Sequence, residues 1–213
     1  MNTEEEARAW VAAKFNVPRE TMARLDAFAA FLNEENLRQN LVSAASLDFL
    51  WTRHIADSAQ LLNWSTDPAA PWLDLGSGAG FPGLIVAALR GGPITLVEER
   101  RLRVDFLLRA AALLEVDVEI IQSRVERVEA RPCATISARA FAPLGRLLEL
   151  GARFSTEKTI WILPKGRNAQ SELDAIETTW QGDLRLEPSL TDPDARIIVA
   201  TGVSRRKARS RRA

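Results

Sequence analysis

The sequence is poor in the residues that most often bind zinc: it has one cysteine, Cys133, and one histidine, His54. These two residues supply neither a structural zinc site nor an internal disulfide, so we expect no metal. No apolar run approaches the ~18 to 20 residues of a membrane-spanning helix. The first ten residues, MNTEEEARAW, are acidic where a secretory signal would be basic and then apolar. We therefore expect a cytoplasmic monomer without membrane association.

The chain has no excess charge of either sign, with 28 Lys and Arg against 28 Asp and Glu. The charge is unevenly distributed, because the last ten residues, SRRKARSRRA, hold six bases and no acid, which leaves 22 bases against 28 acids in the rest. A like-charged block with no apolar residue larger than alanine cannot offset its ordering entropy. We expect residues 204–213 to form a disordered basic tail.

The apolar periodicity changes near residue 70. Before it, the i, i+3, i+4 pattern predicts helices over 3–15, 20–38 and 46–62. We interpret residues 1–70 as an N-terminal helical extension packed on the core, and residues 71–203 as the core itself.

Short apolar runs alternate with helical stretches in this core. The predicted strands are 72–75, 94–98, 118–122, 134–138 and 159–163, followed by an antiparallel hairpin of 183–190 and 195–203. The predicted helices are 83–90, 100–115, 124–129, 143–153 and 169–180. Such alternation indicates parallel βαβ units, and hence an α/β fold with a doubly wound, mainly parallel seven-stranded sheet.

Residues 73–84, LDLGSGAGFPGL, form a glycine-rich turn after the first predicted strand. A Walker phosphate loop is excluded, because Leu84 and Ile85 stand where lysine and a hydroxyl residue are needed. The dinucleotide fingerprint GxGxxG is matched by Gly78, Gly80 and Gly83. A dinucleotide-dependent oxidoreductase is therefore an alternative function.

Two residues of the same turn favour a cationic nucleoside such as S-adenosylmethionine. Asp74 precedes the glycines, and its carboxylate would repel a pyrophosphate but attract a sulfonium. Pro82 removes one backbone N–H from the group that would bind a phosphate. Glu98, at the end of the second strand, would then accept hydrogen bonds from the ribose hydroxyls.

Ligands of open α/β sheets lie at the carboxyl ends of the strands. We therefore expect Val125 and Glu126, after the third strand, to contact adenine, Arg139 after the fourth strand to lie beside the reaction centre, and Lys165 after the fifth to face the same edge.

The residues around the fourth strand exclude several methyl acceptors. The segment SARAF at 137–141 differs from the [ND]PP[YFW] motif of amino-group methylation, and no carboxylate cluster for a metal follows it. Cys133 precedes the strand, at the end opposite to the ligand, so we expect a small buried hydrophobe rather than a nucleophile. By elimination the acceptor carries its own lone pair, as guanine N7 does.

The motifs together resemble those of the glucose-inhibited division protein B family, the small-subunit ribosomal RNA methyltransferase G enzymes. The resemblance covers roughly residues 30 to 200 and rests on NLRQNLVSA (36–44), RHIADS (53–58), LDLGSGAGFPGL, RVE (124–126), SARAFAPL (137–144) and LPKG (163–166). It implies transfer of a methyl group from S-adenosylmethionine to N7 of one guanine in 16S ribosomal RNA of the small ribosomal subunit. A non-catalytic RNA-binding assembly protein that retains a cofactor pocket is a further alternative. The chain departs from many family members at Ala134, where they have an acid, and in its C-terminal tail.

The resemblance and the glycine turn together imply a set of site residues. The expected cofactor contacts are Asp74, Gly76, Ser77, Gly78, Gly80, Phe81, Glu98, Val125, Glu126 and Arg139. Arg139 would also orient the reactants, and no general base is expected. The expected substrate contacts are His54, Asp57, Lys165, Arg205 and Arg206, although His54 and Asp57 would equally suit packing over the cofactor loop.

Overall fold

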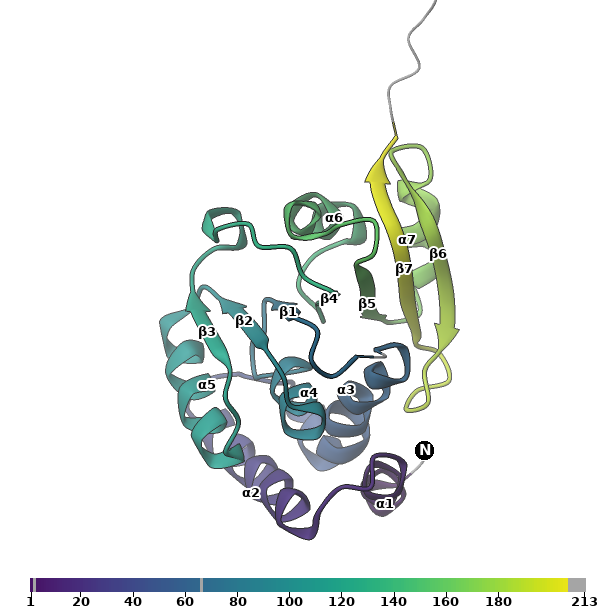
Figure 1. The fold of residues 1–213 in the computed structure, drawn as a ribbon. Coiled ribbons are helices and arrows are strands. Elements are labelled where there is room, and N and C mark those ends of the chain that lie inside the picture. The colour runs from purple at the N-terminus through teal and green to yellow at the C-terminus, as the bar shows by residue number, and fades with distance from the viewer. Residues whose placement is uncertain (2, 66, 207–213) are drawn as a thin grey trace, which may run out of the picture.

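The protein is described by a computed structural model that covers residues 1, 3–65 and 67–206 (Figure 1). Its seven strands form one sheet in the order β3-β2-β1-β4-β5-β7-β6. The strands are β1 (Trp72–Leu75), β2 (Ile94–Glu98), β3 (Glu119–Gln122), β4 (Thr135–Ser137), β5 (Ile160–Lys165), β6 (Trp180–Pro188) and β7 (Arg196–Arg205). Strands β1 to β5 pair in parallel, whereas β7 pairs antiparallel with β5 and β6. The predicted α/β fold, with its antiparallel hairpin at the sheet edge, is confirmed.

Helices cover both faces of this sheet. The α-helices are α1 (Glu4–Lys14), α2 (Arg19–Asn36), α3 (Asp57–Ala59), α4 (Gly83–Arg90), α5 (Arg101–Leu114), α6 (Leu144–Gly151) and α7 (Ala169–Ile176). Short 3-10 turns are η1 (Ala44–Phe49), η3 (Gln60–Trp64), η4 (Val125–Arg127) and η5 (Ala152–Phe154), and η2 (Trp51–Ala56) is a π-helix. In Figure 1, α2 runs beside α5 at one end of the molecule, and the β6–β7 hairpin forms the opposite edge.

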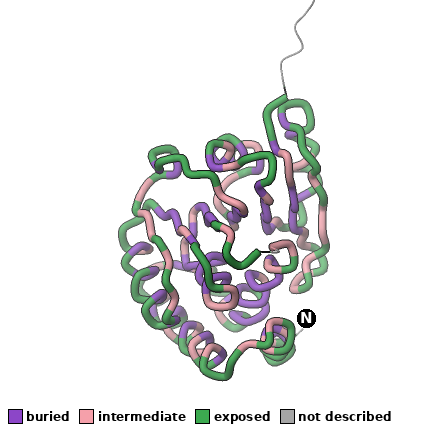
Figure 2. Tube along the Cα trace, in the orientation of Figure 1, coloured by how far each residue is buried: buried purple, intermediate pink, exposed green. Residues whose placement is uncertain are grey.

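The hydrophobic core consists of two clusters, one on each face of the sheet. One cluster joins the N-terminal helices to α4, α5 and the sheet through side chains such as Val11, Leu25, Phe28 and Leu96. The other packs α6, α7 and the hairpin against the opposite face. Figure 2 accordingly shows burial concentrated along the central strands and the inner sides of the helices. Helices α1 and α2 therefore share one core cluster with α4, α5 and the sheet.

Glu4 connects α1 to the π-helix η2, which carries the motif RHIADS. Its carboxylate accepts hydrogen bonds from the backbone N–H groups of Trp51 and Thr52, each at 2.8 Å, and from the Thr52 hydroxyl at 2.7 Å. The predicted helix over 46–62 is therefore not one regular α-helix, but a succession of η1, η2, α3 and η3. A contact from a distant helix fixes this local irregularity.

Two further boundaries differ from the sequence prediction. The predicted helix 124–129 is the single turn η4, and the predicted helix 169–180 ends at Ile176. Strand β6 already begins at Trp180, whose side chain is buried in the second core cluster. Burial of this tryptophan therefore outweighs the local helical pattern.

Strand β7 extends into the segment that we predicted to be a disordered tail. Ser204 and Arg205 belong to β7, and the Arg206 N–H donates to the Thr179 carbonyl at 2.9 Å. The prediction of a disordered segment from residue 204 is thus wrong for 204–206, and its remainder, 207–213, lies outside the described residues.

Candidate active site

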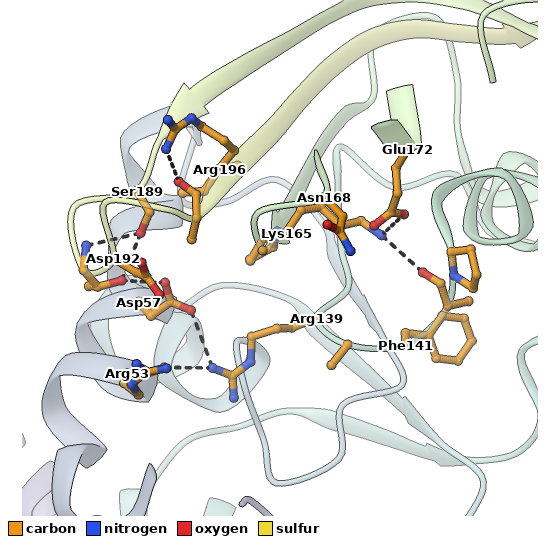
Figure 3. A pocket seen from close by; sticks show the side chains of 18 of the residues that line it. Arg53, Asp57, Arg139, Phe141, Lys165, Asn168, Glu172, Ser189, Asp192 and Arg196 are labelled. Atoms are coloured by element: carbon orange, nitrogen blue, oxygen red, sulfur yellow. Dashed lines mark hydrogen bonds and ion pairs between the residues drawn. The ribbon is translucent and has the colours of Figure 1, made fainter. Parts of the chain in front are cut away.

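Two cavities lie at the carboxyl edge of the parallel strands, on either side of the point between β1 and β4 where the chain order reverses. The first, which we call the donor-side cavity, has a volume of about 370 Å³ and is lined by residues at or after the ends of β1, β2, β3 and β4. The second, the acceptor-side cavity, has a volume of about 670 Å³ and is lined by residues that follow β4 and β5 and by the start of β7 (Figure 3). Ligands of open α/β sheets bind at such a reversal point.

The glycines of the turn serve mainly to let neighbouring groups pack closely. An added Cβ would lie 2.4 Å from Leu84 Cδ1 at Gly80, and 2.2 Å from Phe141 Cδ2 at Gly76. At Gly78 (φ +55°) the nearest such atom is 3.8 Å away. Gly78 is therefore the least crowded of these three glycines.

Glu98 holds the turn and lines the donor-side cavity. Its Oε2 accepts a hydrogen bond from the Gly78 N–H at 3.0 Å, and its Oε1 accepts one from the Arg100 N–H at 2.8 Å. Only 5% of the residue is exposed. Because an ionised carboxylate has about four lone-pair sites, it retains capacity for hydroxyl donors, as predicted for a ribose.

Asp74 and Ser77 lie behind the turn and line neither cavity. Asp74 is fully buried, and its Oδ1 accepts a hydrogen bond from the Ser137 hydroxyl at 2.7 Å. Burial raises the pKa of Asp74, against hydrogen bonds from Ser137 and Ser77 that lower it. The Ser77 hydroxyl donates to the Asp74 carbonyl at 3.2 Å. The position of Asp74 gives no support to the predicted direct contact with a sulfonium; the side chain instead fixes the turn to β4.

Val125 and Glu126 line the donor-side cavity as the strand-end rule predicts. Val125 is buried and apolar, whereas the Glu126 carboxylate is 44% exposed and accepts from Arg146 Nη2 at 2.7 Å. Its own backbone N–H, together with Arg124 and Arg146, lowers the pKa of Glu126. The cavity thus combines an apolar surface with an anionic acceptor, a combination that suits adenine.

Arg139 lines the acceptor-side cavity and is held by the RHIADS segment (Figure 3). Its Nη1 donates to the Arg53 carbonyl at 3.1 Å and lies 3.5 Å from Asp57 Oδ2. The guanidinium carbon also lies 4.9 Å from the centre of the Phe81 ring. Asp57 Oδ1 in turn accepts from Gln60 and Thr191, each at 2.8 Å. The upstream motif therefore orients Arg139.

His54 is a buried structural residue and lines neither cavity. Its ring stacks on Phe81 at 4.9 Å, and its Nε2 lies 2.9 Å from the Ser46 hydroxyl. Burial, with the nearby charges of Arg139 and Arg53, lowers the pKa of His54 to about 3. A neutral, enclosed imidazole packs under the cofactor loop, which is one of the two roles that the sequence left open.

Lys165 lines the acceptor-side cavity but is paired. Its Nζ donates to Glu172 Oε2 at 2.8 Å and to the Ala142 carbonyl at 3.2 Å. The same Glu172 oxygen accepts from the Leu144 N–H at 2.7 Å. Lys165 and Glu172 together hold the segment that follows Arg139.

Arg205 and Arg206 lie at the end of β7 that is remote from both cavities. The register pairs Lys165 with Arg196 at the cavity edge, and Arg205 with Trp180 at the other end of the strand. Arg205 Nη2 donates to Glu149 at 2.7 Å, and Arg206 Nε donates to the Trp180 carbonyl at 2.9 Å. Arg205 and Arg206 therefore do not line the acceptor-side cavity. Arg196, at the opposite end of β7, does line it. We did not predict this residue, although an antiparallel hairpin places the start of its second strand at that edge.

Cys133 is partly buried beside the second core cluster, before β4. Burial raises the pKa of its thiol to about 11. The thiol therefore stays protonated near neutral pH, which agrees with its exclusion as a nucleophile.

The donor-side cavity fits a nucleoside that carries a sulfonium, since it is lined by Gly76, by the buried carboxylate of Glu98, and by the apolar Val125 beside the Glu126 carboxylate. The fold and this site define a class I methyltransferase that uses S-adenosylmethionine. A putative S-adenosylmethionine-dependent methyltransferase from Methanococcus maripaludis superposes with a TM-score of 0.57 at 13% identity, covering 84% of this chain and 94% of that chain. A TehB-like methyltransferase from Corynebacterium glutamicum gives 0.54 at 15% identity, covering 81% and 98%.

The sequence comparisons identify the family within this class. The family model GidB, described as rRNA small subunit methyltransferase G, matches residues 21–191. The ribosomal RNA small subunit methyltransferase G of Rhizorhabdus wittichii is 52% identical over 209 residues, 96% of this chain and 95% of that protein. Its counterpart in Novosphingobium aromaticivorans is 52% identical over 201 residues, 92% and 87% of the two chains. The chain belongs to the GidB family.

Proposed function

We propose that the protein transfers a methyl group from S-adenosylmethionine to N7 of one guanine in 16S ribosomal RNA of the small ribosomal subunit. The observation that carries this proposal is the pair of adjoining cavities, one suited to the nucleoside donor and one lined by Arg53, Arg139, Lys165 and Arg196. A family described by its action on small-subunit ribosomal RNA supplies the substrate class. A dinucleotide-dependent oxidoreductase does not agree with this family membership.

The residues of the donor-side cavity would hold the cofactor. Glu98 would accept from the ribose hydroxyls, Val125 would cover the adenine, and Glu126 would accept from the adenine amino group. When bound, S-adenosylmethionine supplies an electrophilic methyl carbon on a positively charged sulfur.

The protein contributes orientation rather than proton transfer. Guanine N7 carries a free lone pair, so no base has to deprotonate it, and His54, neutral and buried, is placed for packing. Arg139 is fixed by Asp57 and the Arg53 carbonyl with 18% of its side chain exposed, so it can donate hydrogen bonds to the acceptor base. Orientation of two reactants contributes up to ~7 to 11 kcal/mol in favourable cases.

The acidic body of the protein has to overcome repulsion from RNA. Four bases, Arg53, Arg139, Lys165 and Arg196, line the acceptor-side cavity against three acids, Asp57, Glu172 and Asp192, and Asp57 and Glu172 pair with two of the bases. We infer that the basic C-terminal residues add phosphate contacts, and that the protein acts as a cytoplasmic monomer on the RNA. Among the described residues, no helix is long and apolar enough to cross a membrane.

Truncation after Arg206 tests the tail without disturbing β7. It removes Lys207, Arg209, Arg211 and Arg212. Each phosphate contact that is lost should reduce the slope of log affinity against log salt by roughly 0.7 to 0.9, while the affinity for S-adenosylmethionine stays unchanged. An unaltered salt slope for 16S RNA would show that the tail does not bind phosphates.

Methyl transfer itself is measured with radiolabelled S-adenosylmethionine and three substrates: intact small subunits, naked 16S RNA and 23S RNA. We expect label in a small-subunit substrate and none in 23S RNA. Binding of S-adenosylmethionine with no label in any RNA would instead favour the alternative of a non-catalytic RNA-binding assembly protein.

A further inference from the structure

The two cavities of the site share one wall. Ala140, Phe141 and Ala142 line both the donor-side and the acceptor-side cavity. Reacting atoms must approach to about 3 to 3.5 Å for transfer. If the two cavities hold the two reactants, as the proposed function requires, the methyl group has to pass at this three-residue wall.

Phe141 is the large side chain of this wall. Its ring lies directly over Gly76, because a Cβ added there would be 2.2 Å from Phe141 Cδ2. The ring is also partly buried against the core cluster that contains Leu144 and Leu147. Ala140 and Ala142 carry one methyl group each, so Phe141 is the bulky residue of the wall that the two cavities share.

The backbone on both sides of Phe141 is anchored. Arg139 is fixed through Asp57 and the Arg53 carbonyl, and the Ala142 carbonyl accepts from Lys165. Between these anchors, Ala140 has a φ of +50°, a left-handed conformation that is unfavourable for alanine. Strained residues that are held by their surroundings cluster at active sites, ligand clamps and switch regions.

We propose that Phe141 positions the acceptor base: its ring turns from Gly76 into the acceptor-side cavity and stacks on the purine beside Arg139. This inference rests on the proposed function and adds the contact that places the base at the shared wall. Stacking on an aromatic ring suits any base, whereas Arg139 supplies hydrogen bonds along the base edge. The movement also opens the wall at the place where the methyl group passes.

Aliphatic and aromatic replacements separate stacking from simple space filling. Phe141→Leu keeps an apolar side chain of similar size, and Phe141→Tyr keeps the ring. We expect Phe141→Leu to weaken binding of a 16S RNA fragment, measured without S-adenosylmethionine, by at least about fivefold, and to raise the KM for RNA similarly. We expect Phe141→Tyr to stay within about twofold of the wild type in both measurements.

Two controls identify the cause of any loss. Calorimetric affinity for S-adenosylmethionine should change less than about threefold in both variants. Phe15→Leu, at a partly buried ring that directly follows α1 and lines neither cavity, should leave RNA binding unchanged. Wild-type RNA binding in Phe141→Leu, or a loss confined to S-adenosylmethionine affinity, would overturn the inference. If the wild-type protein transferred no methyl group in the methyl-transfer assay used for the KM, that result would refute the proposed function instead.

Discussion

The ion pair between Asp57 and Arg139 joins the two motifs that frame the site, and its strength can be worked out from the structure. The two charged atoms lie 3.5 Å apart, with 17% of the Asp57 side chain and 18% of the Arg139 side chain exposed. Coulomb's law gives about 5 kcal/mol at an effective dielectric constant of ~20 and about 1 kcal/mol in bulk water. Because both side chains retain contact with solvent, we expect a coupling free energy of about 1 to 3 kcal/mol.

A double-mutant cycle in urea measures this coupling. Asp57→Asn keeps an oxygen that can accept from Gln60 and Thr191 but removes the charge, and Arg139→Gln removes the cation. The double variant should be more stable than the sum of the two single losses predicts, by about 1 to 3 kcal/mol. Additivity within ~0.5 kcal/mol would refute the conclusion that Asp57 holds Arg139. In methyl-transfer assays, Asp57→Asn should lower kcat/KM for RNA while leaving S-adenosylmethionine affinity intact.

Three further predictions concern the residues around the glycine turn. Burial lowers the pKa of His54 to about 3 in the folded state, against ~6.5 in the unfolded state, so this contribution to the free energy of unfolding should be complete above pH ~6.5 and fall by about 2 kcal/mol at pH 5. In urea titrations, His54→Asn should lose this part of the dependence of unfolding free energy on pH. An unchanged pH dependence would contradict the burial of His54. Gly80→Ala would place a Cβ 2.4 Å from Leu84 and should lower the free energy of unfolding by ~2 to 4 kcal/mol. Gly78→Ala should cost less, because the heavy atom nearest to its added Cβ is 3.8 Å away. Equal losses would refute the conclusion that Gly80 is required for close packing against Leu84. Glu98→Gln should weaken S-adenosylmethionine binding at least about tenfold in calorimetry, because the amide keeps one acceptor in place of two, and a change below about twofold would remove Glu98 from the cofactor site.

The sheet could be predicted because its strands are short apolar runs in a regular alternation with helices. The irregular segment after residue 44 could not, since Glu4 of a distant helix supplies the hydrogen bonds that stabilise η2 at Trp51 and Thr52. The start of β6 likewise depends on burial of Trp180 in a cluster formed by other elements. Local patterns contain no information about such contacts.

The residues of the site were likewise predictable only where local sequence pattern determines their position. Glu98, Val125 and Glu126 could be placed because the carboxyl ends of parallel strands meet at one edge. Asp74 was assigned to the ligand, but all four residues of β1 are buried, so no alternation in the sequence indicated which way its side chain points. Gly76, an expected cofactor contact, lines the donor-side cavity, and only the structure shows the Phe141 ring packed against it.

The central claim is transfer of a methyl group to guanine N7 in 16S ribosomal RNA. Its most direct measurement is to incubate the wild-type protein with isotopically labelled S-adenosylmethionine and small subunits or 16S RNA, digest the RNA to nucleosides and identify the labelled nucleoside by mass spectrometry. The account predicts one labelled species, 7-methylguanosine, from one position of the RNA. Label in any other nucleoside, or label spread over many guanines, would contradict it.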